Sequence, residues 1–248
     1  MSFTAQTTSA ASAATVRIFL VDSVDNQPKF LSEMPRDKLQ LHSRGFDCFL
    51  SSASVANEQK RDITLPYGSS AALKFVLEAI RNKKPGPVDQ FYLNVTKFTK
   101  AQNVRIWEAC HILTIEPTTV QERLAGKLAW DLSHDPKTTA TDLQEAWHVF
   151  SRFEGIPPTF KVDPLASIIH QFCWDKVHDQ YDEAEADAIL ERCRVTSGAL
   201  YQRVQAKLAE LVEKKRIRDA HRVKNQLDKE ERKRKGEERA RREQCGWR

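Results

Sequence analysis

A short apolar strand that leads directly into an amphipathic helix constrains the fold of this chain more than any other feature. The stretch 61–83 has the sequence RDITLPYGSSAALKFVLEAIRNK. Ile63 to Leu65 have the character of a buried strand, and the proline and glycine that follow favour a turn. The apolar residues after the turn then recur with the spacing of one helix face, at Leu73, Val76, Leu77 and Ile80. Ser69 or Ser70 is expected to cap this helix, because a serine hydroxyl accepts a hydrogen bond from its first free N–H groups. The stretch predicts an α/β (α+β) domain.

Further strands and helices are predicted on both sides of this stretch. Val16 to Asp22 is apolar on both faces apart from Arg17, which is typical of a covered strand. Short strands are also expected at Lys29 to Leu31 and at Phe91 to Leu93. Apolar spacing predicts helices over Arg36 to Ser43, with Gly45 as the stop, and over Phe46 to Ser51 and Val104 to Ile115.

The second half of the chain is predicted to be helical throughout. Thr118 with Gln121, and Thr141 with Gln144, fit the capping box in which a hydroxyl and an amide satisfy free N–H groups at a helix start. The predicted helices cover Val120 to Leu132, Leu143 to Phe153, Pro164 to Val177 and Glu183 to Cys193. The first two of these helices each carry a tryptophan that we expect to be buried, Trp130 and Trp147.

One long helix is expected from Ser197 onward. Its first part has a coiled-coil-like seam of apolar residues at Leu200, Val204, Leu208 and Leu211. Beyond Val212 the seam fails, and charged neighbours at i+4 are expected to keep the tail helical in water. We therefore expect four parts: a disordered leader at 1–15, a folded domain at 16–132, a helical extension at 133–212 and a basic charged tail at 213–248.

Composition indicates an intracellular protein, cytoplasmic or nuclear. The five cysteines form no CxxC pair and are odd in number, which favours reduced thiols over a disulfide framework. The leader MSFTAQTTSAASAAT lacks the charged and apolar regions of a secretory signal. No stretch approaches the roughly 18 apolar residues that a membrane span requires.

The residue patterns do not favour catalysis. His170, Cys173 and His178 come closest to a metal site, but His178 is turned about 80° from His170 on a helix and no fourth ligand has suitable spacing. Cys110 and His111 are adjacent in an apolar helix, where they point about 100° apart. With 8 glycines and no G-x-S-x-G or phosphate-binding loop, the sequence predicts no catalytic, cofactor-binding or metal site. A pocket with convergent polar groups near Cys110 or His170 would favour an enzyme instead.

The net charge of +5 is concentrated in the C-terminal tail. Between Lys207 and Glu243 there are about 15 Lys or Arg and about 9 Asp or Glu. Nucleic acid binding or nuclear import is one interpretation of the basic clusters, and a solvated helix is the other, because glutamates are interleaved with them. The clusters contain Lys214, Lys215, Arg216, Arg218, Arg232, Lys233, Arg234 and Lys235.

Three groups of apolar positions together resemble a BTB/POZ domain, in particular the divergent BTB-type proteins of fungi. Leu39, Ser43 and Phe46 form the pattern L-x3-S-x2-F, and Ile63-x-Leu65 precedes the helix described above. The third group is the run Ile106 to Ile115, IWEACHILTI. The resemblance covers Val16 to Leu132. It departs from the family at Pro35, where many members have histidine, and at 81–83, where Arg-Asn-Lys replaces Tyr-Thr-Gly.

The resemblance implies a small sheet capped by helical hairpins and a role as a protein interaction module. Its implied partners are a second copy of the chain, another protein, or a cullin-type ubiquitin ligase scaffold. The residues expected on the interaction surface are Val16, Ile18, Leu20, Leu39, Phe46 and Phe49. The alternative is a nucleic-acid-associated protein that binds through the basic tail and uses the folded part to dimerise.

Overall fold

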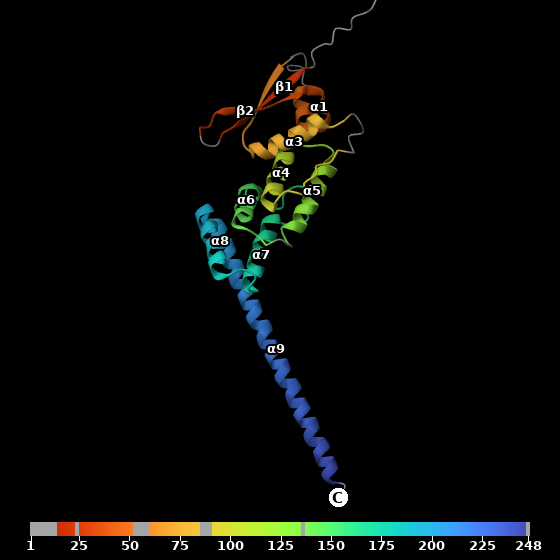
Figure 1. The fold of residues 1–248 in the computed structure, drawn as a ribbon, viewed down its shortest axis with the longest axis vertical. Helices are drawn as coiled ribbons and strands as arrows, with labels where there is room; N and C mark the ends of the chain where they lie inside the picture. The colour runs from red at the N-terminus through yellow and green to blue at the C-terminus, as the bar shows by residue number, and fades with distance from the viewer. Residues whose placement is uncertain (1–13, 23–24, 52–59, 85–90, 135–136, 247–248) are drawn as a thin grey trace, which may run out of the picture. The chain divides into compact units, whose positions relative to one another are not determined.

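The computed structural model describes residues 14–22, 25–51, 60–84, 91–134 and 137–246 (Figure 1). The chain forms two compact units, residues 1–168 and 169–248. The expected leader lies outside the described residues up to position 13.

A three-stranded sheet forms one layer of the first unit. Strand β1 (Thr15–Val21) is central and pairs antiparallel with β2 (Pro28–Pro35) and parallel with β3 (Lys60–Leu65). Val16 lies opposite Met34, and a bulge shifts the β1–β2 register between Ile18 and Phe19. Strand β2 extends to Pro35, beyond the expected end at Leu31. The polar residues Ser32 and Glu33 interrupt the apolar pattern, although Ser32 and Met34 are buried.

The helices α1 (Arg36–His42) and α2 (Arg44–Leu50) are separated by a single residue, Ser43. Ser43 has an extended backbone, and its hydroxyl accepts from Phe46 N at 3.2 Å and donates to Leu113 O at 2.5 Å. Gly45 lies inside α2, so the expectation that it stops a helix was wrong. The break between α1 and α2 lies at Ser43, two residues before Gly45. Ser43 can interrupt the helix because its hydroxyl donates a hydrogen bond to Leu113 O, far along the chain.

The predicted helix after β3 is confirmed as α3 (Ser70–Asn82), and Ser69 caps it by accepting from Ala72 N. Its buried face consists of Ala72, Leu73, Val76, Leu77 and Ile80. Helices α1 and α3 lie on one side of the sheet and pack on β2 (Figure 1). They close the core over the inner face of the sheet.

Three more helices lie wholly within the first unit: α4 (Lys100–Ile112), α5 (Thr118–Asp131) and α6 (Ala140–Phe150). The two predicted capping boxes were wrong. Pro117 precedes α5 without a side-chain cap, and Thr139 with Asp142 caps α6. A further capping box, Thr99 with Gln102, begins α4. Because α6 packs on α4, the first unit extends past the expected boundary at residue 132.

Two apolar predictions in this unit were also wrong. Phe91 to Leu93 do not form a strand, although Phe91 is buried against the ring of His42 at 4.8 Å. Trp130 is 63% exposed and stacks on His134 at 3.7 Å, and Trp147 is half-buried. The periodicity of an amphipathic helix does not show how far a large ring at the edge of its apolar face is covered.

The second unit contains the end of α7 (Pro164–Val177), α8 (Glu183–Thr196) and the 49-residue helix α9 (Gly198–Gly246). The predicted seam is confirmed, because Leu200, Val204, Leu208 and Leu211 are all buried. The fold class is confirmed as well: a small sheet flanked by helices is followed by further helices and a long charged helix. No described helix combines the length and the apolar character needed to cross a bilayer.

Candidate interaction site

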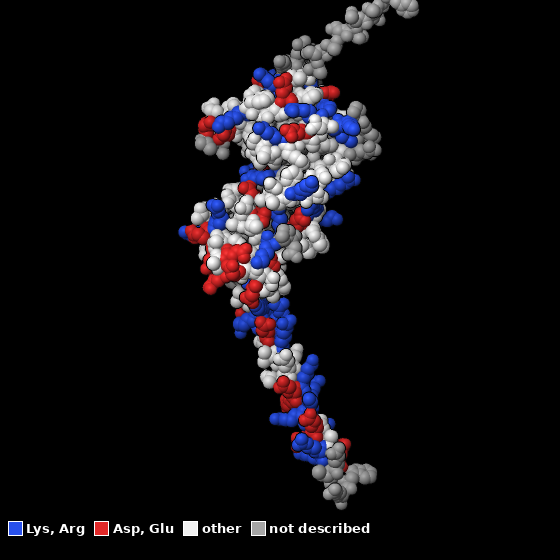
Figure 2. Space-filling view, viewed as in Figure 1, with Lys and Arg blue, Asp and Glu red and all other residues white. Residues whose placement is uncertain are grey.

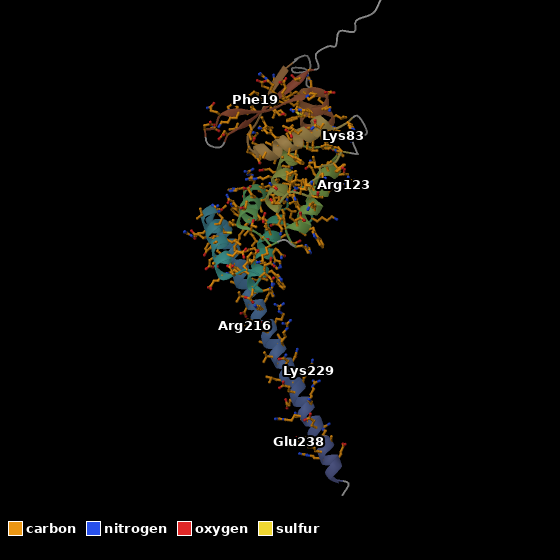
Figure 3. All side chains as sticks on the ribbon, in the orientation of Figure 1. Phe19, Lys83, Arg123, Arg216, Lys229 and Glu238 are labelled. Carbon is orange, nitrogen blue, oxygen red and sulfur yellow. The ribbon has the colours of Figure 1, made fainter. Side chains whose placement is uncertain are left out.

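The sheet of the first unit has one buried face and one open face in the described part of the chain. On β1, Val16 and Ile18 point into the core, whereas Arg17 and Phe19 point away from it. Phe19 lies opposite Phe30, and their rings meet edge to face with centroids 5.8 Å apart. Phe30 is 57% exposed. Figure 3 labels Phe19 on this sheet.

Charged residues border the Phe19–Phe30 pair. Arg17 binds the Asp62 carboxylate with two hydrogen bonds of 2.7 Å, and its guanidinium lies 5.9 Å from the centre of the Phe19 ring. Thr15 donates to Glu33 Oε1 at 2.7 Å. We call the set Arg17, Phe19, Phe30, Glu33 and Asp62 the outer sheet face. It joins an apolar centre to a charged rim, which is the usual organisation of a protein interface.

Most of the residues predicted for the interaction surface lie elsewhere. Val16, Ile18 and Leu39 are completely buried, and Phe46 is nearly so. These four residues form the core instead, because they occupy the inner face of the sheet and the helix sides packed against it. The other two are accessible: Leu20 is half-buried, and Phe49 is exposed beneath the Arg61 guanidinium at 5.4 Å.

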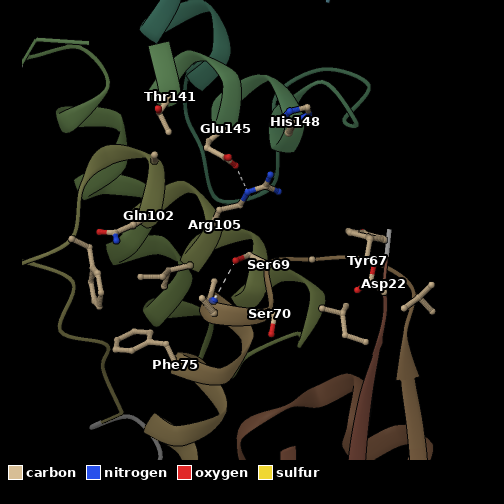
Figure 4. A pocket seen from close by; sticks show the side chains of 18 of the residues that line it. Asp22, Tyr67, Ser69, Ser70, Phe75, Gln102, Arg105, Thr141, Glu145 and His148 are labelled. Atoms are coloured by element: carbon tan, nitrogen blue, oxygen red, sulfur yellow. Dashed lines mark hydrogen bonds and ion pairs between the residues drawn. The ribbon is translucent and has the colours of Figure 1, made fainter. Parts of the chain in front are cut away.

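A second accessible feature of the first unit is a groove with a volume of about 990 Å³ (Figure 4). The end of β1 and the turn from β3 into α3 form one side, with Leu20, Asp22 and Tyr67. The start of α4 and one face of α6 form the other, with Gln102, Arg105, Glu145 and His148. In Figure 4, Glu145 and His148 approach from α6, whereas Ser69, Ser70 and Phe75 come from the start of α3.

The charged side chains of the groove already pair with each other. Arg105 of α4 binds Glu145 of α6 on the same side of the groove and also binds Glu108 at 2.9 Å. Arg152 binds the other oxygen of Glu108 and lies 4.8 Å from the centre of the Tyr67 ring. Glu108 is only 3% exposed. The arrangement balances two arginines with two glutamates, so the groove has no excess charge from this network.

The groove brings aromatic side chains close to these charges. Phe75 of α3 and Phe98, which precedes α4, meet edge to face at 5.0 Å. Ser69 is occupied as a helix cap, and the imidazole of His148 lies 3.5 Å from Gln144. Ser69 and His148 are therefore each engaged with other residues and do not form a nucleophile–base pair.

The cysteines and histidines considered above as a catalytic pair or a metal site lie in packed helices. Cys110 is fully buried, and burial raises the pKa of its thiol to about 12. His111 stacks on Trp107 with centroids 5.5 Å apart. The Cys173 thiol donates to Val204 O at 3.6 Å, and His178 Nδ1 contacts Trp174 O at 2.8 Å. Among the described residues, no group of three or more potential ligands could hold a metal ion.

The basic clusters of the tail lie on α9, where Figure 2 shows both acidic and basic side chains. Lys215 donates to Val177 O at 2.6 Å, and Arg218 lies 3.0 Å from His178 Nε2 and 5.7 Å from the Trp174 ring. These two residues continue the buried seam, so α9 stays packed on the end of α7 for two turns longer than predicted. The remaining cluster residues are exposed, namely Lys214, Arg216, Arg232, Lys233, Arg234 and Lys235.

The sequence patterns did not indicate which residues form the outer sheet face and the groove. The alternation of Arg17 and Phe19 with buried neighbours was a usable signal for the outward side of β1. The bulge that sets Phe30 beside Phe19, and the approach of α6 to α4, depend on tertiary packing. Comparison of this chain with protein-family models, curated proteins and solved structures finds no match.

Proposed function

We propose that the first unit is a non-catalytic protein interaction module of BTB/POZ type that self-associates through its outer sheet face. The observation that carries the proposal is the Phe19–Phe30 pair, in which Phe30 is 57% exposed and Phe19 is half-buried. The Arg17–Asp62 ion pair frames it, on the face of the sheet that no helix covers within the described residues. An aromatic pair within a charged rim has the composition of an interface centre.

The order of the elements supports the same proposal. Strands β1 and β2 are followed by the paired helices α1 and α2, and strand β3 then leads into α3 and the paired helices α4 and α5. This order agrees with the sheet and helical hairpins that the resemblance implies. A cullin-type scaffold is an additional partner class that the resemblance suggests, and it belongs in the same binding experiments.

The test is sedimentation of the full-length chain from about 1 to 100 µM, with Phe30→Ser compared to the wild type. Loss of a central aromatic contact costs about 2 kcal/mol, so we expect dimerisation to weaken about 30-fold. Tyr92→Ser is the matched control, because Tyr92 is 66% exposed and lies outside the sheet and the groove. This control should dimerise as the wild type does.

Two results would contradict the proposal. One is a wild-type chain that stays monomeric at 100 µM. The other is a dimer that Phe30→Ser leaves unchanged, which would point to another surface such as α9. Circular dichroism of Phe30→Ser should match the wild type, since an exposed ring contributes little to the core.

A further inference from the structure

The exposed part of α9 separates its charges in space although they alternate in sequence. Successive residues of an α-helix are turned by about 100°. On this basis Arg218, Arg222, Lys229, Arg232 and Lys233 all lie within about 50° of one line along the helix. We call these five residues the basic face.

The acidic residues of the same segment avoid this face. All of those between Leu211 and Ala240 lie about 90° or more from the line, namely Glu213, Asp219, Asp228, Glu230, Glu231, Glu237 and Glu238. The basic face continues the side of α9 that is buried upstream at Leu208 and Leu211. It therefore begins at Arg218, where α9 leaves the end of α7, and continues along the exposed helix.

The ion pairs show that this charge is only partly neutralised. No ion pair of Lys229 or Arg232 occurs within the residues that the structure describes. Arg222 and Lys233 lie 3.9 Å from their nearest carboxylates, those of Asp219 and Glu237. On the opposite side the pairs are shorter: Arg216 holds Glu213 at 2.8 Å, and Lys235 holds Glu231 at 2.6 Å.

The spacing of the basic face fits a row of phosphates. It extends about 22 Å from Arg218 to Lys233, at about 1.5 Å per residue. A nucleic acid duplex presents one negative charge per roughly 1.7 Å of its axis, so several phosphates lie within this length. Side chains on one face of a straight helix can reach such a row without bending the helix.

Other polyanions fit the helix less well. Val223 and Leu227 lie on the far side of α9 together with Glu230, Glu231 and Glu238, so no uninterrupted apolar face is available to enter an anionic membrane. The described part of α9 contains no Phe, Tyr or Trp after Tyr201, so it lacks the large aromatic rings on which proteins that bind single strands stack unpaired bases. We propose that the basic face binds the phosphate backbone of duplex nucleic acid without sequence preference.

The first test measures binding of the full-length chain to a fluorescent 20-base-pair DNA duplex of arbitrary sequence. The affinity should be the same for a second, unrelated duplex. It should fall with salt between 50 and 200 mM, with a log–log slope of roughly −4 for four to five phosphate contacts. A single strand of the same length should bind less tightly.

The decisive test compares two variants that lose the same charge from opposite sides of α9. The first carries Arg222→Gln, Lys229→Gln, Arg232→Gln and Lys233→Gln on the basic face. The second carries Arg216→Gln, Lys224→Gln, Arg234→Gln and Lys235→Gln on the far side. Both lose two arginines and two lysines, and glutamine is nearly as good a helix former as either. Their helicity, followed by circular dichroism, should match the wild type.

We expect the basic-face variant to bind at least 10-fold more weakly and with a salt slope near −1, because one contact remains. The far-side variant should stay within about 3-fold of the wild type. Equal losses in the two variants would overturn the proposal, since they would show that net charge alone matters. Absence of duplex binding at 50 mM salt would overturn it too, as would a basic face that binds anionic vesicles in preference to the duplex. Dimerisation through Phe30 is measured separately, so either proposal can fail without the other.

Discussion

The carboxylate of Asp142 holds the first turns of two helices at once. Its Oδ1 accepts a hydrogen bond from Ala101 N at 2.9 Å, at the start of α4. Its Oδ2 accepts from Thr139 N at 2.9 Å and from the Thr139 hydroxyl at 2.8 Å, at the start of α6. Asp142 is buried, so water cannot replace these bonds. One side chain thus fixes the spacing of α4 and α6, which carry one side of the groove.

The substitution Asp142→Ala should lower the free energy of unfolding of the first unit by about 2 to 4 kcal/mol. It removes the side-chain hydrogen bonds that Asp142 accepts at the start of each helix, at about 1 kcal/mol for each helix, and leaves the buried Ala101 N–H without an acceptor. Urea denaturation followed by tryptophan fluorescence, to which the fully buried Trp107 contributes, measures the change. The control is Thr141→Ala, at an exposed position that the sequence suggested as the cap. It should change stability by less than about 0.5 kcal/mol, and a larger effect there than at Asp142 would contradict this account.

The ion network of the groove predicts an unequal response at its two ends. Glu108 is buried and accepts from both Arg105 and Arg152, whereas the Arg152 side chain is 43% exposed. Glu108→Ala should destabilise the first unit by about 3 kcal/mol, because it leaves Arg105 half-buried next to fewer carboxylates. Arg152→Ala should cost about 1 kcal/mol or less, since water can reach the site. Urea denaturation of both variants checks the order, and a larger loss for Arg152→Ala would contradict it.

Periodicity located most elements because it reports which side of an element is covered. The spacing of Leu73, Val76, Leu77 and Ile80 placed α3, and the seam from Leu200 to Leu211 placed the packed part of α9. Local capping patterns predicted helix starts less well where two neighbouring residues could each serve as the N-cap. Thr139 and Thr141 both precede an acceptor three residues later, and only the position of Ala101 on α4 explains why Thr139 and Asp142 form the cap.

The candidate surfaces needed information that no local pattern contains. Val16 and Leu39 were predicted on the interaction surface, but an apolar residue is equally suited to a core, and packing decides between them. The groove exists because α6 folds back on α4, which brings Glu145 to Arg105 over 40 residues of chain. The basic face differs from these two, because the helix angle of each charged residue of α9 follows from the sequence once the helix is assumed.

The cysteines of the core should resist modification in the folded chain. Burial raises the pKa of the thiols of Cys110 and Cys173 to about 12 and that of Cys193 to about 11. At pH 8 only roughly 10⁻³ to 10⁻⁴ of such thiols would be ionised, and the thiolate is the reactive form. Cys48, by contrast, is exposed.

Alkylation with iodoacetamide at pH 8, read by peptide mass spectrometry, tests this difference. Cys48 should be labelled within minutes, and Cys110, Cys173 and Cys193 only after denaturant is added. The variant Cys48→Ser should remove the fast label from the peptide that contains position 48 without exposing Cys110, Cys173 or Cys193. Rapid labelling of Cys110 in the native chain would show that the first unit opens around α4.

We expect the free energy of unfolding of the first unit to fall in mild acid because of two of its histidines, His42 and His111. Burial is the main cause that lowers the pKa of His42 and of His111 in the folded chain. The unfolded chain therefore binds more protons than the folded chain once the pH falls below the usual histidine pKa of about 6.5. Stability contributed by the neutral imidazoles is present above that pH and is lost as the pH falls through it.

The free energy of unfolding should accordingly decrease from pH 7.5 to pH 5.5 in urea denaturation followed by tryptophan fluorescence. His111→Phe should make the decrease smaller, because it removes one titrating ring and retains aromatic contact with Trp107 and Phe153. The free energy of unfolding of His111→Phe at pH 7.5 shows whether the core accommodates the larger ring. The decrease on acidification is therefore measured for each protein relative to its own value at pH 7.5. Stability that stays constant or rises as the pH is lowered would contradict the burial of these neutral histidines, since only a folded state that binds fewer protons loses stability in acid.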